Sequence, residues 1–150
     1  MQHTIVVTLR RFAALAAVFF IAVLATPNVA LADDAPIGTW KTIDDETGEA
    51  KSLVKIYERD GKLYGKIIKL FKNPDATCDA CEGEDHGAPI KGMVIMWALE
   101  QDGDEWAGGK IFDPKKGKTY KCKIWLDGDK LKVRGYAGPF FRTQTWHRAS

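Results

Sequence analysis

The sequence has little net charge. Its 150 residues include 22 Lys and Arg against 20 Asp and Glu. Residues 1–32 contain two of the basic residues, Arg10 and Arg11, and no acidic one, so the remainder carries 20 of each sign. A neutral body has no long-range field that would attract a polyanion, which argues against nucleic acid as the partner. The length is typical of a single domain.

Long apolar runs are missing except at the N-terminus. There, 14 apolar residues, Phe12 to Ala25, follow Arg10 and Arg11 and precede Ala30-Leu31-Ala32. A basic start, a short apolar helix and small residues at the −3 and −1 positions are typical of a cleaved secretory signal. As a helix, this run would rise about 21 Å, which is too short to span a bilayer core of roughly 30 Å.

This layout predicts where the protein goes. We expect cleavage after Ala32, a mature chain that begins at Asp33 without a transmembrane segment, and the bacterial periplasm as the destination. No cysteine follows the apolar run, so a lipid anchor is not indicated.

Helical periodicity is missing after residue 33. The chain consists instead of short alternating runs separated by turn residues, among them Arg59-Asp60-Gly61 and Asp127-Gly128-Asp129. The runs are 37–43, 50–57, 62–70, 92–99, 105–112, 119–126, 130–136 and 140–148. Eight strands joined mostly by tight hairpins predict an all-β, eight-stranded antiparallel up-and-down barrel, which has no exposed edges. A sandwich is the competing architecture, but it generally needs longer crossing connections.

One connection, 71–91, departs from the regular spacing. It is too long for a hairpin turn, and long connections are places where function is expected. Run 92–99 is apolar on both faces, so its outer side needs a cover, which this connection could provide.

Several short motifs resemble a known family. Gly38-Thr39-Trp40 opens the first run, and Arg142 and Arg148 flank Trp146 in the last, as in the lipocalin signature. Further segments resemble, in order, a bacterial envelope family catalogued as domain of unknown function 2147. They include Lys62-Leu63-Tyr64-Gly65-Lys66-Ile67, Gly108-Gly109-Lys110-Ile111, Val133-Arg134-Gly135-Tyr136 and Arg142-Thr143-Gln144-Thr145-Trp146. The resemblance covers about residues 36 to 148 and implies a periplasmic, lipocalin-like barrel whose base is closed by Trp40 and Arg142.

The chain has only three cysteines. Cys78 and Cys81 lie in the long connection, and an oxidising compartment favours a disulfide between them, with Cys122 left as a buried small hydrophobe. Zinc binding by Cys78, Cys81 and His86, with Asp85 or Glu84 as fourth ligand, is an alternative, as is a redox-active thiol pair. The spacing lacks the second cysteine pair of a strong zinc motif, and no helix start is indicated that would activate a thiol.

Catalytic constellations are also lacking. No Ser/His/Asp or Cys/His arrangement and no glycine-rich phosphate loop occurs. The acidic cluster Asp44-Asp45-Glu46 lies in a turn that ends at Gly48, so turn chemistry accounts for it. Gly108-Gly109 lies within a strand pattern and indicates a bulge or a close backbone approach. We therefore predict no enzyme activity, no cofactor and no metal.

Aromatic residues, by contrast, are numerous, with five Trp, four Tyr and seven Phe. An eight-stranded barrel either is filled by its own side chains or holds one small ligand. Inward glycines, Gly65 and Gly135, favour space inside. We predict a monomeric binding protein for a small apolar molecule, with the 71–91 connection as lid or base. Alternation predicts the lining residues Val54, Ile56, Leu63, Ile67, Tyr120, Ile124, Leu131 and Val133.

A basic outer face offers a second hypothesis. Five cations share the outer face of the 119–136 hairpin with Trp125 and Tyr136: Lys121, Lys123, Lys130, Lys132 and Arg134. This face could bind an anionic envelope surface, in which case the protein would be an interaction protein with a filled core. The alternative is a solvated lysine face that keeps the strands from pairing wrongly.

Overall fold

The structure is a computed structural model that describes residues 35–149. The predicted signal segment 1–32 and its cleavage after Ala32 lie outside the described residues. Within the described part of the chain, no helix has the length and apolar character needed to cross a membrane.

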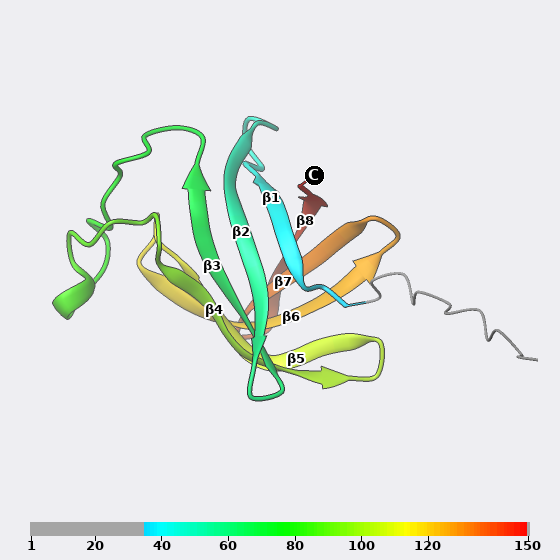
Figure 1. Ribbon diagram of the computed structural model, residues 1–150. Helices are drawn as coiled ribbons and strands as arrows, with labels where there is room; N and C mark the ends of the chain where they lie inside the picture. Colours follow the sequence, from blue (N-terminus) through cyan, green and yellow to red (C-terminus); the bar gives the residue numbers. More distant parts are fainter. Residues whose placement is uncertain (1–34, 150) are drawn as a thin grey trace, which may run out of the picture. The chain divides into compact units, whose positions relative to one another are not determined.

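Eight antiparallel strands form a closed barrel in which each strand pairs with the next along the chain (Figure 1). The strands are β1 (Gly38–Ile43), β2 (Ala50–Arg59), β3 (Lys62–Leu70), β4 (Val94–Asp102), β5 (Glu105–Asp113), β6 (Lys118–Asp127), β7 (Lys130–Ala137) and β8 (Phe140–Arg148). Pairing of Trp40 with Arg148 and of Lys41 with His147 joins β1 to β8 and closes the sheet. The predicted up-and-down barrel is confirmed.

Turn chemistry sets the hairpins as the sequence predicts. Asp60 and Gly61 both have positive φ, 53° and 73°, and join β2 to β3 in a two-residue turn. Between β1 and β2, the Asp44 carboxylate accepts hydrogen bonds from the backbone N–H groups of Glu46 and Thr47, each at 3.0 Å. These bonds lower the pKa of Asp44. This carboxylate is therefore committed to shaping the turn.

A bulge and a close backbone approach adapt β4 and β5 to the closed sheet. Gly108 has a φ of 77° at a register shift between β5 and β6, and a Cβ on Gly109 would lie 2.2 Å from the carbonyl oxygen of Trp97. The bulge and the close backbone approach expected at these glycines are thus both present. Ala98 also has a positive φ, 54°, which is uncommon for a residue other than glycine.

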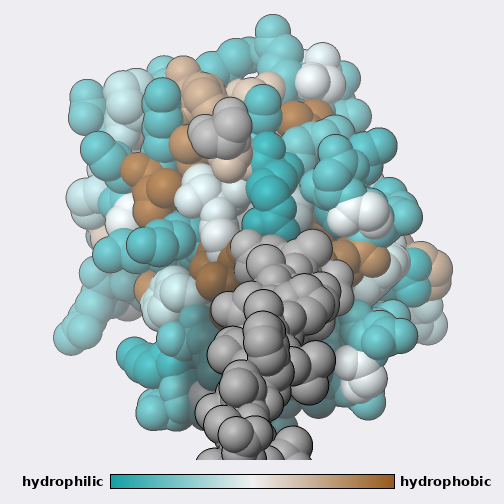
Figure 2. Space-filling model, turned by 45° about the vertical axis from the view of Figure 1, so that its right-hand side comes forward, coloured by the Kyte–Doolittle hydropathy of each residue, from teal (hydrophilic) through white to brown (hydrophobic). Residues whose placement is uncertain are grey.

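The large apolar side chains gather at one end of the barrel. Trp40, Ile56, Leu63, Leu99, Ile124 and Leu131 are fully buried, and Trp146 is nearly so. Trp40 donates a hydrogen bond from Nε1 to the carbonyl oxygen of Pro36 at 2.8 Å. The outer surface is different: on the face shown in Figure 2, hydrophilic residues predominate and apolar ones form small separate groups. The barrel is therefore held together from within, by a core at its closed end.

Arg148, not Arg142, covers this closed end, which corrects the assignment made from sequence. The Arg148 guanidinium lies 4.4 Å from the centre of the Trp40 ring and donates a hydrogen bond to the carbonyl oxygen of Ile37. A Cβ on Gly38 would lie 3.0 Å from the same guanidinium. Gly38, Trp40 and Arg148 thus form one packed unit. Arg142 lies at the opposite end of β8, where it pairs with Asp45.

Candidate ligand-binding cavity

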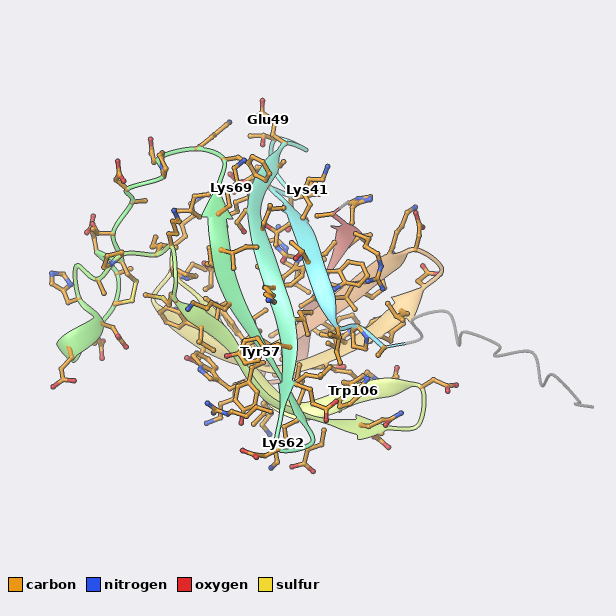
Figure 3. The ribbon with its side chains drawn as sticks, viewed as in Figure 1. Lys41, Glu49, Tyr57, Lys62, Lys69 and Trp106 are labelled. Carbon is orange, nitrogen blue, oxygen red and sulfur yellow. A yellow bond between two sulfur atoms is a disulfide. The ribbon has the colours of Figure 1, made fainter. Side chains whose placement is uncertain are left out.

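A cavity of about 880 Å³ occupies the end of the barrel opposite Trp40 and opens to solvent there. Its mouth is formed by the β1–β2, β5–β6 and β7–β8 turns and by the β3–β4 loop, residues 71–93. Figure 3 marks the two ends: Glu49 lies at the mouth, and Lys62 lies at the other end of the barrel. One end of the interior is therefore filled by side chains and the other end is hollow.

Tapering rows of inward side chains explain why the cavity lies at this end. Along β2, toward the mouth, the inward residues are Ile56, Val54, Ser52 and Ala50. Along β7 they are Leu131, Val133, Gly135 and Ala137. Each row begins with large side chains and ends with small ones, so the strands that pack tightly at the closed end leave space near the mouth.

The cavity wall is largely apolar and carries a few polar groups. The apolar members include Ile67, Leu70, Ile90, Ile95, Ile111, Tyr120 and Val133. Thr42 and Ser52 add a buried hydroxyl pair whose oxygens are 2.7 Å apart. Gln144 donates to a carboxylate oxygen of Asp45 at 2.9 Å and accepts a hydrogen bond from Nε1 of Trp146. Such a wall suits an apolar molecule that one or two polar groups orient.

Ion pairs across neighbouring elements hold the rim. Arg142 of β8 meets Asp45 of the β1–β2 turn at 2.5 Å, and Lys115 lies 4.0 Å from Glu46. Lys72 of the β3–β4 loop pairs with Glu49, and this partner raises the pKa of Lys72. All these pairs are exposed, so they fix the position of the rim more than they stabilise the fold.

The β3–β4 loop lies at the mouth and forms part of the cavity wall. Ala76, Thr77, Asp79, Ala80 and Ile90 line the cavity. The loop folds back on itself through hydrogen bonds from Cys78 N to Ala88 O and from Ile90 N to Ala76 O. In Figure 1 it lies to the left of β3, beside the turn that joins β5 to β6. The position of this loop is therefore consistent with the expected lid role. The second role expected of it is to cover run 92–99. In that run, Trp97 of β4 packs against Phe112 of β5, with ring centres 6.4 Å apart.

A disulfide joins Cys78 and Cys81 in this loop. The two thiols that the zinc alternative requires as ligands are bonded to each other in this disulfide. Nδ1 of His86, the third ligand of that alternative, lies 3.1 Å from the carbonyl oxygen of Cys81. The 3₁₀ helix η1 (Gly83–Asp85) follows the cysteines and is the only helix among the described residues, so no helix begins at the cysteine pair. Cys122 is free and buried, and burial raises the pKa of its thiol to about 12.

The eight residues predicted to line a cavity fall into two groups. Ile67, Tyr120 and Val133 lie in the cavity wall. The other five belong to the packed core: Val54, Ile56, Leu63, Ile124 and Leu131. Alternation places all eight inside but does not tell the filled end from the hollow one. The decrease in side-chain size along β2 and β7 is the sequence signal that would have found Ala50, Ser52 and Gly135.

The five predicted basic residues have different partners. Lys123 pairs with Glu105 at 2.6 Å, which raises its pKa, and Lys132 lies 3.6 Å from Asp127 and donates to Thr145. Arg134 lies over the rings of Trp125 and Phe141. Lys121 and Lys130 are exposed at opposite ends of the β6–β7 hairpin. This face is therefore not one uniform basic surface.

Comparison with known proteins supplies the family. Residues 38–148 match the family described as uncharacterized proteins conserved in bacteria, DUF2147. The chain belongs to this family. Among solved structures, this chain is similar to protein HP1028 of Helicobacter pylori, which is described as belonging to the lipocalin family. The TM-score is 0.67 at 23% identity, over 76% of this chain and 82% of that one. The comparison with curated proteins found no match.

The resemblance drawn from Gly38, Trp40 and the closing segment is thus confirmed at the level of family and fold. This DUF2147 chain has a lipocalin-like barrel.

Proposed function

We propose that this protein is an exported, monomeric binding protein that carries one small, predominantly apolar molecule in the barrel cavity. The observation that carries the proposal is the cavity itself, about 880 Å³ in volume, apolar in its depth and open at one end. Pockets that enclose small molecules typically measure about 300–1,000 Å³. A lipocalin-like fold, which provides a rigid wall around such a space, is consistent with binding.

The chemistry of the wall defines the ligand class. Binding is favoured by roughly 25 cal/mol of free energy for each Å² of apolar surface that the ligand removes from water. The hydroxyl pair of Thr42 and Ser52 and the amide of Gln144 provide hydrogen-bonding partners near the mouth. We infer an elongated or aromatic apolar molecule with a polar group at one end. No step of chemistry is needed, and we propose no catalysis.

The periplasm is the proposed location. The layout of the N-terminal segment supports export: Arg10 and Arg11 come first, then the apolar run, then Ala30-Leu31-Ala32. The disulfide between Cys78 and Cys81 is consistent with an oxidising compartment.

A cavity-filling substitution tests the proposal. Gly135 lies in the cavity wall, and a Cβ there would lie 3.5 Å from the nearest atom, the Cβ of Tyr120, so Gly135→Leu projects into the space without a backbone clash. The probe is N-phenyl-1-naphthylamine, an uncharged apolar dye that fluoresces on leaving water. We expect wild-type protein to bind it and Gly135→Leu to bind it at least about tenfold more weakly.

Thr119→Leu is the matched control, because Thr119 is exposed on the outer side of β6. It adds similar bulk outside the barrel and should leave dye binding unchanged. Equal binding by wild type and Gly135→Leu, or no binding by wild type, would rule out the cavity as the site.

A further inference from the structure

Two adjacent phenylalanines at the cavity mouth are unusually exposed. Phe140 and Phe141, at the start of β8, are 77% and 60% exposed, the highest values among the large apolar side chains of the described residues. Both also border the mouth of the cavity. Contiguous exposed apolar side chains are unfavourable in water and mark surfaces that contact another apolar body.

Cations lie directly beside these rings. The Arg134 guanidinium is 4.4 Å from the centre of the Phe141 ring and 4.9 Å from that of Trp125, and its Nε donates to Thr143. The ring of Tyr136 lies 6.1 Å from that of Phe141, and Lys121 is paired with Tyr136 across the β6–β7 hairpin. Arg134, Tyr136 and Phe141 therefore form one aromatic–cationic surface. Lys118 and Lys121 line a shallow hollow with Tyr136 beside it.

These cations are free of carboxylate partners. Among residues 35–149, the side-chain ion pairs involve Lys62, Lys72, Lys115, Lys123, Lys132 and Arg142, but not Arg134, Lys118 or Lys121. Lys118 and Lys121 are both exposed. Their charge is thus available to an anionic partner.

Acidic side chains of the mouth lie on other elements. The β1–β2 turn contains Asp44, Asp45, Glu46 and Glu49, and the β3–β4 loop contains Asp75, Asp79, Glu82, Glu84 and Asp85. The β6–β7–β8 side of the rim carries the exposed aromatics together with three cations that have no ion-pair partner among the described residues, Lys118, Lys121 and Arg134. This uneven distribution gives the molecule one side suited to a negatively charged surface.

We propose that the aromatic–cationic patch, made up of Lys118, Lys121, Arg134, Tyr136, Phe140 and Phe141, docks the barrel onto an anionic lipid bilayer. Phe140 and Phe141 enter the interfacial layer, where aromatic rings are favoured, and the cations contact the headgroups. A bilayer fits the patch because it offers both requirements at once, an apolar layer and dense negative charge. One consequence rests on the proposed function: a ligand carried in the barrel would pass between the cavity and the bilayer at the rim.

Vesicle co-sedimentation tests this proposal on protein exported by a bacterium and purified without detergent. The vesicles are phosphatidylcholine with about one quarter phosphatidylglycerol, compared with pure phosphatidylcholine. We expect binding to the anionic vesicles and weaker binding to the neutral ones. Phe140→Ser/Phe141→Ser should weaken binding at least about tenfold, and Phe140→Trp should retain it. All variants share one N-terminus, so any contribution from that segment is common to all of them.

A matched pair of charge reversals tests the orientation. Lys121→Glu, within the patch, should weaken binding at least about fivefold, because each cation at an anionic surface contributes about that factor. Lys130→Glu lies on the same hairpin at the opposite end of the barrel and should leave binding within about twofold of wild type. Thermal unfolding midpoints equal to wild type confirm that each variant is folded.

Three results would overturn the proposal: no binding of wild type to the anionic vesicles, undiminished binding of the Phe140/Phe141 variant, or equal loss in Lys121→Glu and Lys130→Glu. Dye titration without vesicles is carried out on the same variants. It distinguishes loss of docking from loss of cavity binding, since docking requires no occupied cavity.

Discussion

Gly65 and Gly135 both face the barrel interior, from β3 and β7, but their surroundings differ. A Cβ on Gly65 would lie 3.0 Å from the Cβ of Met96 and 3.3 Å from Cγ1 of Val54, so this glycine is needed for close packing. At Gly135 the nearest atom would be 3.5 Å away, and the residue lies in the cavity wall. The expectation that inward glycines leave space therefore holds for Gly135 and is wrong for Gly65.

Alanine at these two positions should have opposite effects on stability. Gly65→Ala inserts a methyl group into packed core, and we expect it to lower the free energy of unfolding by about 1–3 kcal/mol. Gly135→Ala should be neutral or stabilising by up to about 1 kcal/mol, since it restricts the unfolded chain without a clash. Urea denaturation of both variants measures these changes. Equal destabilisation would contradict the division into a filled and a hollow end.

Cys122 shows how burial controls a single ionisable group. Its thiol is 3% exposed, and desolvation raises its pKa from 9.0 to about 12. At pH 8 it should contain about a thousandfold less thiolate than an ordinary cysteine. We therefore expect no reaction with a thiol reagent in the native protein and complete reaction in denaturant.

The same shift predicts a pH dependence of stability. Between pH 9 and pH 12 the unfolded thiol loses its proton while the folded one keeps it, so the folded state binds more protons and stability falls as pH rises. Cys122→Ala removes this contribution. Unfolding of wild type and Cys122→Ala measured from pH 8 to pH 11 checks it, and identical pH profiles would show that the thiol is not the cause.

At the scale of elements, alternation and turn residues suffice to predict the strands, because a period of two and Asp-Gly turns are local properties. The fourth strand is the exception: it is predicted at 92–99 and observed at Val94–Asp102. Ala98 adopts a positive φ there. Alanine in the middle of a strand rarely takes this conformation, so no local pattern reveals it.

The assignment of Arg142 fails for a related reason. Arg142 and Arg148 are both on β8 and both lie near Trp146 in sequence. Only the closure of β8 onto β1, with Trp40 opposite Arg148, decides which of them meets Trp40. That pairing joins the two ends of the sheet and cannot be predicted from β8 alone.

The β3–β4 loop should respond to removal of its disulfide without loss of the barrel. Cys78→Ser/Cys81→Ser opens a bridge between residues only three apart, and bridges over such short loops stabilise by about 2 kcal/mol or less. We expect a modestly lower thermal midpoint and faster dissociation of N-phenyl-1-naphthylamine, because the lid is less constrained. Stopped-flow measurement of the dissociation rate tests this. An unfolded barrel, or an unchanged rate, would contradict the role of the loop as a lid.

For the whole molecule, the sequence predicts a closed barrel because eight alternating runs with short turns have few other arrangements. Whether that barrel is hollow depends on how the inward rows meet across the interior, a property of all strands together. The taper from Ile56 to Ala50 and from Leu131 to Ala137 is visible in the sequence, but it gains meaning only once both rows are known to point into the same space.

Native mass spectrometry tests most directly whether the cavity carries a ligand. The protein is exported by a bacterium and purified without detergent or chelator. We predict an extra mass of a few hundred daltons that is lost on denaturation and is absent from Gly135→Leu, on a polypeptide that begins at Asp33. A bare wild-type polypeptide that also fails to take up N-phenyl-1-naphthylamine would contradict the account.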